Sequence, residues 1–354
     1  MKDKNNLSQR SFISSKKQRD PYIDNIRLAL VIFVVLGHLI SPFKNENELI
    51  YFLNNFLATF RMPALVMLTG FFAKNFQKEG YIEKITIKLF IPYLIFQFLY
   101  SYDHDFSVNW FNPSMGLWFL LSLYFWNLML FIFTHLKYPI VISLITGIGI
   151  GLVEDAGHYF SIARTFTFFP FFLFGFYLKT EHIHLLKTNI AKKFSVIAAI
   201  AIISILNSFP PPLIRGLLLG KHSFEQLNLN DLEGILLKIL IYFMMILGIL
   251  TILPWIPKKR FTFSYYGQKT AYIYILHLFI IGLLHKVAWF DYYELWKFIV
   301  SPLIALAISF VLCTKSILLI SRPFIEGTII YNINLLLKKL LLHFPKHIWK
   351  SRAE

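Results

Sequence analysis

Three side chains able to do chemistry share one face of the first apolar segment of the chain. They are Asp24, Arg27 and His38. In an α-helix each residue turns by about 100°, so the 11-residue step from Arg27 to His38 returns to within about 20° of the same direction, and Asp24 lies about 40° to the other side of His38. The same step separates Arg27 from His38 by about 16 Å along the helix axis.

Each of these residues has a chemical use and a simpler interpretation. A fixed guanidinium suits phosphate groups, and an imidazole can accept a proton from a hydroxyl. Alternatively, Arg27 could extend to lipid headgroups or only pair with Asp24, and His38 could only hydrogen-bond to a neighbouring helix. Because polar groups inside an apolar segment are costly, three of them on one face favour a site. We expect a molecule held by Arg27 to extend toward His38.

The composition indicates a membrane protein. The 354 residues are 56% hydrophobic and 18% aromatic, with 38 Phe, and only 15% are charged, whereas soluble domains carry about 25% charged residues. The mean hydropathy is +0.59. A formal net charge of +16 is compatible with a nucleic-acid ligand, but that interpretation requires basic residues clustered on a water-exposed surface. The alternative is a multi-pass cell-membrane protein whose basic residues lie in cytoplasmic loops.

Apolar runs long enough to cross a bilayer predict about ten transmembrane helices, hence an all-α polytopic bundle. The expected domains are a basic cytoplasmic tail over 1–21, a membrane domain over 22–320 and a cytoplasmic C-terminal segment over 321–354. The expected spans are 22–43, 56–73, 86–101, 115–133, 138–153, 166–178, 194–209, 235–254, 270–286 and 298–320.

The distribution of charge supports this arrangement. With the N-terminus inside and alternating spans, most Lys and Arg fall in inside segments, while Asp and Glu outnumber them outside. Basic residues accumulate on the cytoplasmic side of membrane proteins, so both termini are predicted to be cytoplasmic. The positive charge is then a topology signal, and no nucleic-acid partner is expected. The apolar run over 329–344 contains two lysines, which favours a helix lying in the membrane interface.

The sequence predicts neither a metal site nor a bound cofactor. Cys313 is the only cysteine, which excludes a disulfide framework and a thiolate metal site. His182 and His184 are close in sequence but have no acidic or thiolate partners at ligand spacing.

Six stretches resemble the acyltransferase-3 family of integral-membrane acyltransferases, in particular its fucose 4-O-acetylase-like subgroup. Arg27, ten intervening residues and His38 are similar to the family's signature of a basic residue, a ten-residue spacer and histidine. The order of the stretches supports the family but says little about the substrate. They read RDPYIDNIRLALVIFVVLGH (19–38), RMPALVMLTGFF (61–72), KLFIPY (88–93), LWFLLSLYFW (117–126), SIARTFTFFPFFLFGFYLK (161–179) and YIYILH (272–277).

The resemblance implies a donor site and a catalytic centre. His38 would act as general base or as transient acyl carrier, and Asp24 would orient Arg27. Arg27, Lys84 and Lys88 would bind the phosphates of the donor, although lysines at this place also fit the ordinary excess of basic residues on the cytoplasmic side.

Four further residues are candidates for acceptor binding or oxyanion stabilisation: Arg61, Thr69, Arg164 and His277. The family pattern usually has Ser at the position of Thr69, so threonine keeps the hydroxyl, and often has His at the position of Arg61, where this sequence departs from the pattern. Arg61 could instead extend outward to headgroups. Arg164 could form an ion pair with Glu154 or Asp155, and His277 could serve only helix packing.

The resemblance implies transfer of an acyl group from cytoplasmic acyl-CoA, with acetyl-CoA as the expected co-substrate, to a hydroxyl of an extracytoplasmic or lipid-linked cell-envelope saccharide. A glycan or glycolipid transporter without acyl chemistry is the alternative. The resemblance does not specify the acceptor sugar. It also leaves open whether the acyl group is acetyl or a larger group such as succinyl, and whether transfer is direct or passes through an acyl-histidine intermediate.

Overall fold

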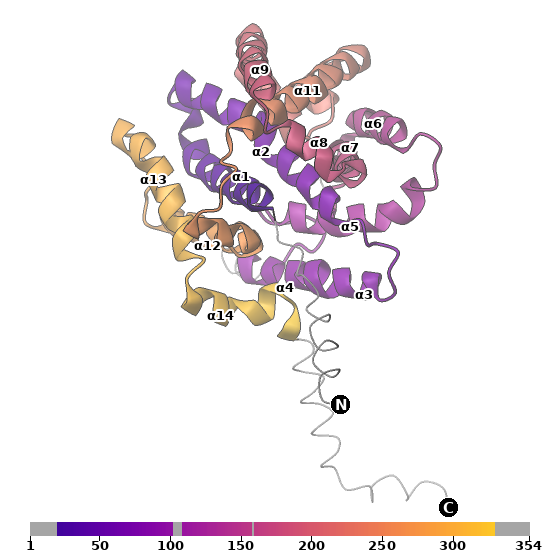
Figure 1. The fold of residues 1–354 in the computed structure, drawn as a ribbon. Coiled ribbons are helices and arrows are strands. Elements are labelled where there is room, and N and C mark those ends of the chain that lie inside the picture. Colours follow the sequence, from indigo (N-terminus) through magenta and orange to yellow (C-terminus); the bar gives the residue numbers. More distant parts are fainter. Residues whose placement is uncertain (1–19, 102–107, 158, 330–354) are drawn as a thin grey trace, which may run out of the picture.

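The computed structural model describes residues 20–101, 108–157 and 159–329. These residues form helices joined by short connections, with no strand among them (Figure 1). The prediction of an all-helical protein is confirmed for this part of the chain. Most of the N-terminal tail and the interfacial helix predicted over 329–344 lie outside the described residues, and the predicted domain limits stay predictions.

The helices differ greatly in length. Two of the shorter ones, α3 and α4, are joined by η2 (Thr86–Phe90), a turn of π-helix. The 3₁₀ segments used below are η1 (Ser41–Asn45), η4 (Ile150–Leu152), η7 (Leu253–Trp255) and η8 (Thr262–Gln268). The α-helices are α1 (Pro21–Ile40), α2 (Glu48–Phe72), α3 (Tyr81–Ile85), α4 (Ile91–Tyr100), α5 (Trp118–Phe133), α6 (Pro139–Gly149), α7 (Ile162–Tyr177), α8 (Thr180–Leu185), α9 (Asn189–Ser208), α10 (Pro211–Leu219), α11 (Asp231–Ile252), α12 (Thr270–Lys286), α13 (Leu295–Val311) and α14 (Lys315–Ile325).

Four helical stretches are long and apolar enough to cross a membrane, or up to six if each of two bent pairs counts as one span. The four are α1 with η1, α2, α9, and α11 with η7. The bent pairs are η8 with α12, at 82°, and α13 with α14, at 73°. The helices α5, α6 with η4, and α7 are apolar but shorter. The count of ten spans and the cytoplasmic position of both termini therefore remain predictions.

Two regions differ from the sequence expectation. The tenth expected span, 298–320, is divided between α13 and α14, because α13 ends at Val311 and Thr314 adopts an extended backbone before α14 begins at Lys315. The connection expected over 210–234 contains a helix, α10. Prolines at the start of α10 and Gly220 in the left-handed conformation at its end are typical helix boundaries.

Helix α1 lies in the middle of the bundle, packed against α2, α12, α13 and η8 (Figure 1). It begins at Pro21, and the Asp20 side chain caps it by accepting a hydrogen bond of 2.9 Å from the Tyr22 backbone N–H. Such a cap contributes about 1 kcal/mol. Asp20 also contacts Lys187 and His184, at 2.9 and 3.1 Å, which ties the start of α1 to the α8 region.

Helices α2 and α7 cross in close contact because each carries a glycine where it meets the other. A Cβ atom on Gly70 would overlap the Phe172 carbonyl oxygen, and one on Gly175 would overlap the Met67 carbonyl oxygen. Small residues allow membrane helices to approach in this way. The contact fixes α7, and therefore Arg164, relative to Arg61 on α2.

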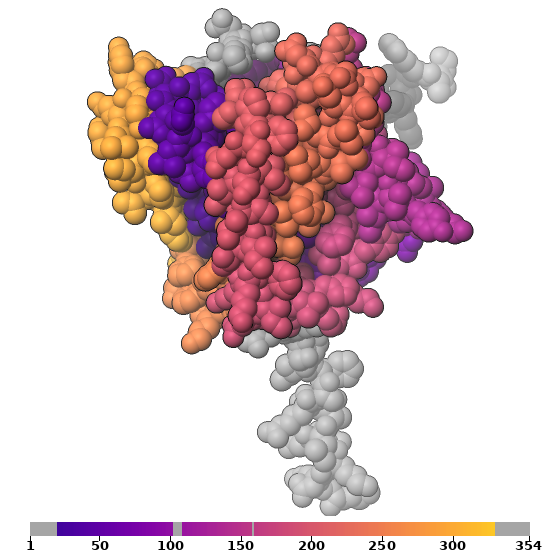
Figure 2. All heavy atoms as spheres, turned by 90° about the horizontal axis from the view of Figure 1, so that it is seen from above, coloured from indigo at the N-terminus to yellow at the C-terminus, as the bar shows by residue number. Residues whose placement is uncertain are grey.

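The surface of α9, α11 and α13 is apolar. Figure 2 shows α9 lying lengthwise on the outside of the molecule with α11 beside it. Large apolar side chains are exposed along all three helices, among them Phe194, Ile197, Ile200, Leu236, Phe243, Ile299 and Leu303. Water would not stabilise so many exposed apolar side chains on these helices, whereas lipid acyl chains would.

We predict that Gly175→Ala lowers the thermal unfolding midpoint of the detergent-solubilised protein, because overpacking at a tight contact typically costs about 1–3 kcal/mol. Gly149→Ala is the matched control, since a Cβ atom there has no neighbour within 4 Å and alanine favours the helix. Equal midpoints for the two variants would contradict the close α2–α7 contact.

Candidate active site

A cleft of about 520 Å³ lies beside α1 and gathers three basic side chains. Arg27 comes from α1, Lys84 from α3 and Lys88 from η2. Both lysines are exposed. The structure thus places the three residues predicted to bind the donor in one cleft, although a long segment of chain separates Arg27 from the two lysines.

Arg27 is held in place within this cleft. Its Nη2 donates a hydrogen bond of 3.2 Å to Thr270 Oγ1, and its guanidinium lies over the Phe72 ring, 5.3 Å from the centroid. Asp24 is buried and accepts a hydrogen bond of 3.3 Å from Gln268 Nε2. Since Gln268 ends η8 immediately before the helix that carries Thr270, Asp24 helps to position the partner of Arg27.

Lys88 lies in η2, a turn of π-helix. A π turn inserts an extra residue into the helix and is often found at functional sites. Here it separates the short helix carrying Lys84 from α4. Both lysines therefore present their side chains to the cleft from the same bent segment.

A second, smaller cavity of about 150 Å³ surrounds His38. Three arginines line it with His38, namely Arg61 from α2, Arg164 from α7 and Arg215 from α10. None of the residues lining this cavity, all of which belong to the described part of the chain, is acidic. The cavity is therefore strongly cationic.

Arg61 is buried against α1, with 7% of its surface exposed. Its guanidinium occupies the space that a side chain at position 37 would take, which is free because that residue is Gly37. Its Nη1 is buried and has no hydrogen-bond partner within the described structure. Arg61 thus points into the cavity beside His38, and the outward extension considered from the sequence is not observed.

The other two arginines are fixed by neighbouring side chains. Arg215 Nη1 donates a hydrogen bond of 2.5 Å to Asn54 Oδ1, and its Nη2 lies 3.5 Å from Ser41 Oγ. Arg164 lies over the Trp118 ring, 4.9 Å from the centroid. This cation–π contact takes the place of the ion pair expected with Glu154 or Asp155.

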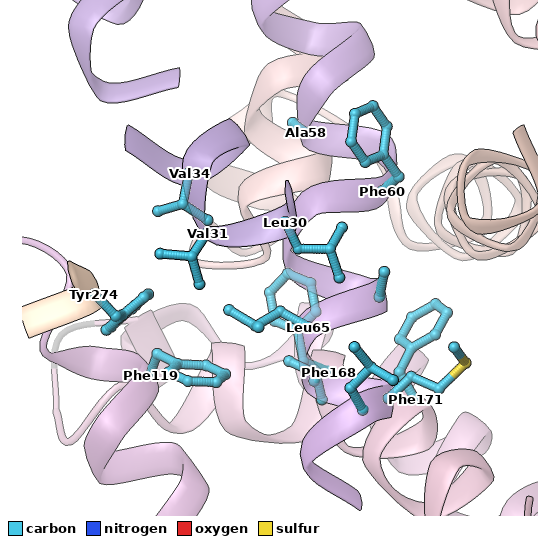
Figure 3. Packing of buried hydrophobic residues seen from close by; sticks show 14 of the residues in the cluster. Leu30, Val31, Val34, Ala58, Phe60, Leu65, Phe119, Phe168, Phe171 and Tyr274 are labelled. Atoms are coloured by element: carbon cyan, nitrogen blue, oxygen red, sulfur yellow. The ribbon is translucent and has the colours of Figure 1, made fainter. Parts of the chain in front are cut away.

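Tyr274 forms part of the wall between the two cavities, since it lines both. Its hydroxyl donates a hydrogen bond of 2.8 Å to the Gly116 carbonyl. On α1, Val31 lines the larger cleft and Val34 the smaller cavity. Figure 3 shows these valines near Tyr274 and Phe119. Apolar and aromatic groups therefore separate the donor cleft from His38.

His277 lies directly beside His38. The two ring centroids are 5.2 Å apart, and His277 is fully buried. Its Nδ1–H donates a hydrogen bond of 3.0 Å to the Ile273 carbonyl, while Nε2 is buried without a partner in the described structure. The sequence expectation that His277 belongs to the same site is consistent with this position.

The arrangement separates the four acceptor or oxyanion candidates. Arg61 and Arg164 share the cavity with His38, whereas Thr69 lines the donor cleft and donates a hydrogen bond to the Val66 carbonyl. Eight residues separate Arg61 from Thr69 on α2, about 12 Å along the axis, so the two serve different cavities.

Sequence reasoning missed two site residues, Arg215 and Tyr274. Arg215 is the single charged residue in the run LIRGLLLG (213–220), which is the same signal that identified Arg27. The run falls in a segment that the sequence predicts to connect two spans, where a charged residue is ordinary. Tyr274 lies in the stretch YIYILH (272–277), but a tyrosine there does not stand out as a site residue in a sequence with 18 tyrosines.

Comparison with known proteins agrees with this geometry. Residues 20–317 match the acyltransferase domain of the acyltransferase-3 family. No curated protein and no solved structure matches the chain. The match covers most of the chain and nearly all of the described helices, while the narrower fucose 4-O-acetylase-like subgroup remains a prediction. With its apolar helices and the match across its length, the chain belongs to the acyltransferase-3 family of integral-membrane acyltransferases.

Proposed function

We propose that the protein transfers an acyl group, an acetyl group in the first instance, from cytoplasmic acyl-CoA to a hydroxyl of an extracytoplasmic or lipid-linked saccharide of the cell envelope. The observation that carries this proposal is the presence of two cavities along α1. One presents Arg27, Lys84 and Lys88, and the other presents His38. Acyl-CoA is a co-substrate, and the residues present imply no bound cofactor.

The larger cleft suits the donor. Arg27, Lys84 and Lys88 can pair with the phosphate groups of CoA, since guanidinium and ammonium groups form strong charge-assisted hydrogen bonds with phosphate. The slender pantetheine arm would then extend along α1 toward His38, over an axial distance of about 16 Å. Thr69, in the same cleft, would contact the donor and not the reacting carbonyl.

The smaller cavity suits the chemical step. In direct transfer, the His38 imidazole takes the proton of the acceptor hydroxyl while the hydroxyl oxygen attacks the thioester carbonyl. The tetrahedral intermediate collapses with cleavage of the carbon–sulfur bond, and the CoA thiolate takes up the proton. In the two-step alternative, the imidazole nitrogen attacks the carbonyl and expels the CoA thiolate, which takes up the ring proton; the acceptor hydroxyl then attacks the acyl-imidazole and gives its proton to the departing ring nitrogen. Guanidinium groups of Arg61 or Arg164 would stabilise the oxyanion.

Family membership gives no support to the alternative of a transporter or flippase without acyl chemistry. The two possibilities differ in a simple observable. A purified acyltransferase releases free CoA when acyl-CoA and a saccharide acceptor are both present, whereas a transporter moves saccharide without releasing CoA.

We predict that His38→Ala lowers acyl transfer by about 10²- to 10⁴-fold, the usual contribution of a general base. The measurements are CoA release by the purified protein and acyl-ester content of envelope saccharides by mass spectrometry. His135→Ala, which changes an exposed histidine at the end of α5, is the control. Undiminished acylation with normal membrane expression of the His38 variant would refute the catalytic assignment.

We predict that the double variant Lys84→Gln, Lys88→Gln raises the KM for acyl-CoA about tenfold with little change in kcat. One tenfold step corresponds to about 1.4 kcal/mol, close to the lower end of the range of about 1.5–3 kcal/mol for hydrogen bonds to charged groups. Acyl-pantetheine lacks the nucleotide phosphates, so the variant and the wild type should use it equally. Lys78→Gln, at an exposed position away from the cleft, is the control. An unchanged KM would remove both lysines from the donor site.

A further inference from the structure

The cavity around His38 holds more positive charge than the acyl-transfer step requires. Transfer develops one negative charge on the thioester oxygen, and this charge disappears when the product forms. Three guanidinium groups, from Arg61, Arg164 and Arg215, line the cavity, and the described residues around it supply no carboxylate. Arginine stays protonated in proteins, so the cavity is cationic before any acyl group arrives.

Two of these guanidinium groups lie on either side of the catalytic histidine along α1. Arg61 packs on Gly37, one residue before His38, and Arg215 Nη2 lies 3.5 Å from Ser41, three residues after it. The two arginines come from α2 and α10. An acceptor presenting its hydroxyl to His38 would therefore place its neighbouring substituents between these two groups.

Arg61 supplies a further sign of a missing ligand. It is more than nine-tenths buried, lines the cavity, and its Nη1 has no partner among the described residues. A buried donor without a partner is unfavourable, and more so when it is charged. An anionic ligand would pair with this donor, and the planar fork of arginine matches the two oxygens of a carboxylate or phosphate.

We propose that the acceptor carries a fixed negative charge close to the hydroxyl that is acylated, and that Arg61 and Arg215 bind this charge. The anionic group is a carboxylate on the sugar itself or a phosphate that joins the sugar to its neighbour or to a lipid carrier. This inference rests on the proposed function. Arg61 and Arg215 would then select acidic saccharides as acceptors, in addition to any role in oxyanion stabilisation.

The first test identifies the acylated unit. Envelope saccharides from cells with and without the protein are compared by tandem mass spectrometry. We expect the acyl group on a unit that bears a carboxylate or adjoins a phosphate, and fragmentation distinguishes the two sources. An acyl group on a neutral unit with no adjoining anion overturns the inference while the proposed function stands. No acyl difference at all overturns both.

The second test isolates the charge with purified full-length protein. The identified acceptor is compared with its neutral form, in which the carboxylate is converted to an amide or the phosphate is removed. We expect Arg215→Gln to lower kcat/KM for the charged acceptor by about 10- to 100-fold, with little effect on the neutral acceptor or on the KM for acyl-CoA. Arg215→Lys, which keeps the charge, should retain part of the activity.

Equal losses for the charged and neutral acceptors would show that Arg215 is only structural and would overturn the inference. Lys137→Gln removes a positive charge at an exposed position outside both cavities and is the control for net charge. Because the first test uses wild-type protein only, the inference remains falsifiable even if an arginine variant does not fold.

Discussion

The geometry of the site depends on the hydrogen-bond ladder of one buried helix. Because α1 runs unbroken from Pro21 to Ile40, the separation and relative direction of Arg27 and His38 are set by helical rise and twist and not by flexible loops. The neighbouring helices only have to present their side chains to one side of α1. The caps and contacts at its start, from Asp20 to Lys187 and His184, therefore affect the whole site.

Periodicity made part of this site predictable and part not. Asp24, Arg27 and His38 belong to one helix, so their shared face follows from spacing alone, and the all-helical fold follows from composition. Arg61, Arg164 and Arg215 line one cavity only because of the way α2, α7 and α10 pack. The close packing of α2 against α7 in turn requires Gly70 and Gly175. The spacing of residues within one helix does not predict how different helices pack against one another.

The differences from the sequence expectation have physical causes. The bend at Thr314 falls at three polar residues, Thr314, Lys315 and Ser316, but the residues on both sides are apolar, so a hydropathy average over a whole span does not separate the two helices. Three consecutive prolines mark the boundary of the preceding helix and also begin α10, with Pro210 as N-cap and Pro211 and Pro212 as the first helical residues. The cation–π contact of Arg164 with Trp118 could not be predicted from the sequence, because a chain that is 18% aromatic offers many possible aromatic partners for an arginine.

The wall at Tyr274 also bears on the permeability of the membrane. A protein that binds one substrate from each side of a bilayer risks forming a continuous aqueous path for protons and ions. Here the hydroxyl of Tyr274 is satisfied by the Gly116 carbonyl, and Val31, Val34 and Phe119 surround the remaining space with apolar groups that do not bind water. The reactive end of the proposed donor would pass such a wall only by displacing side chains, so the same wall would limit leakage of protons and ions through the resting protein.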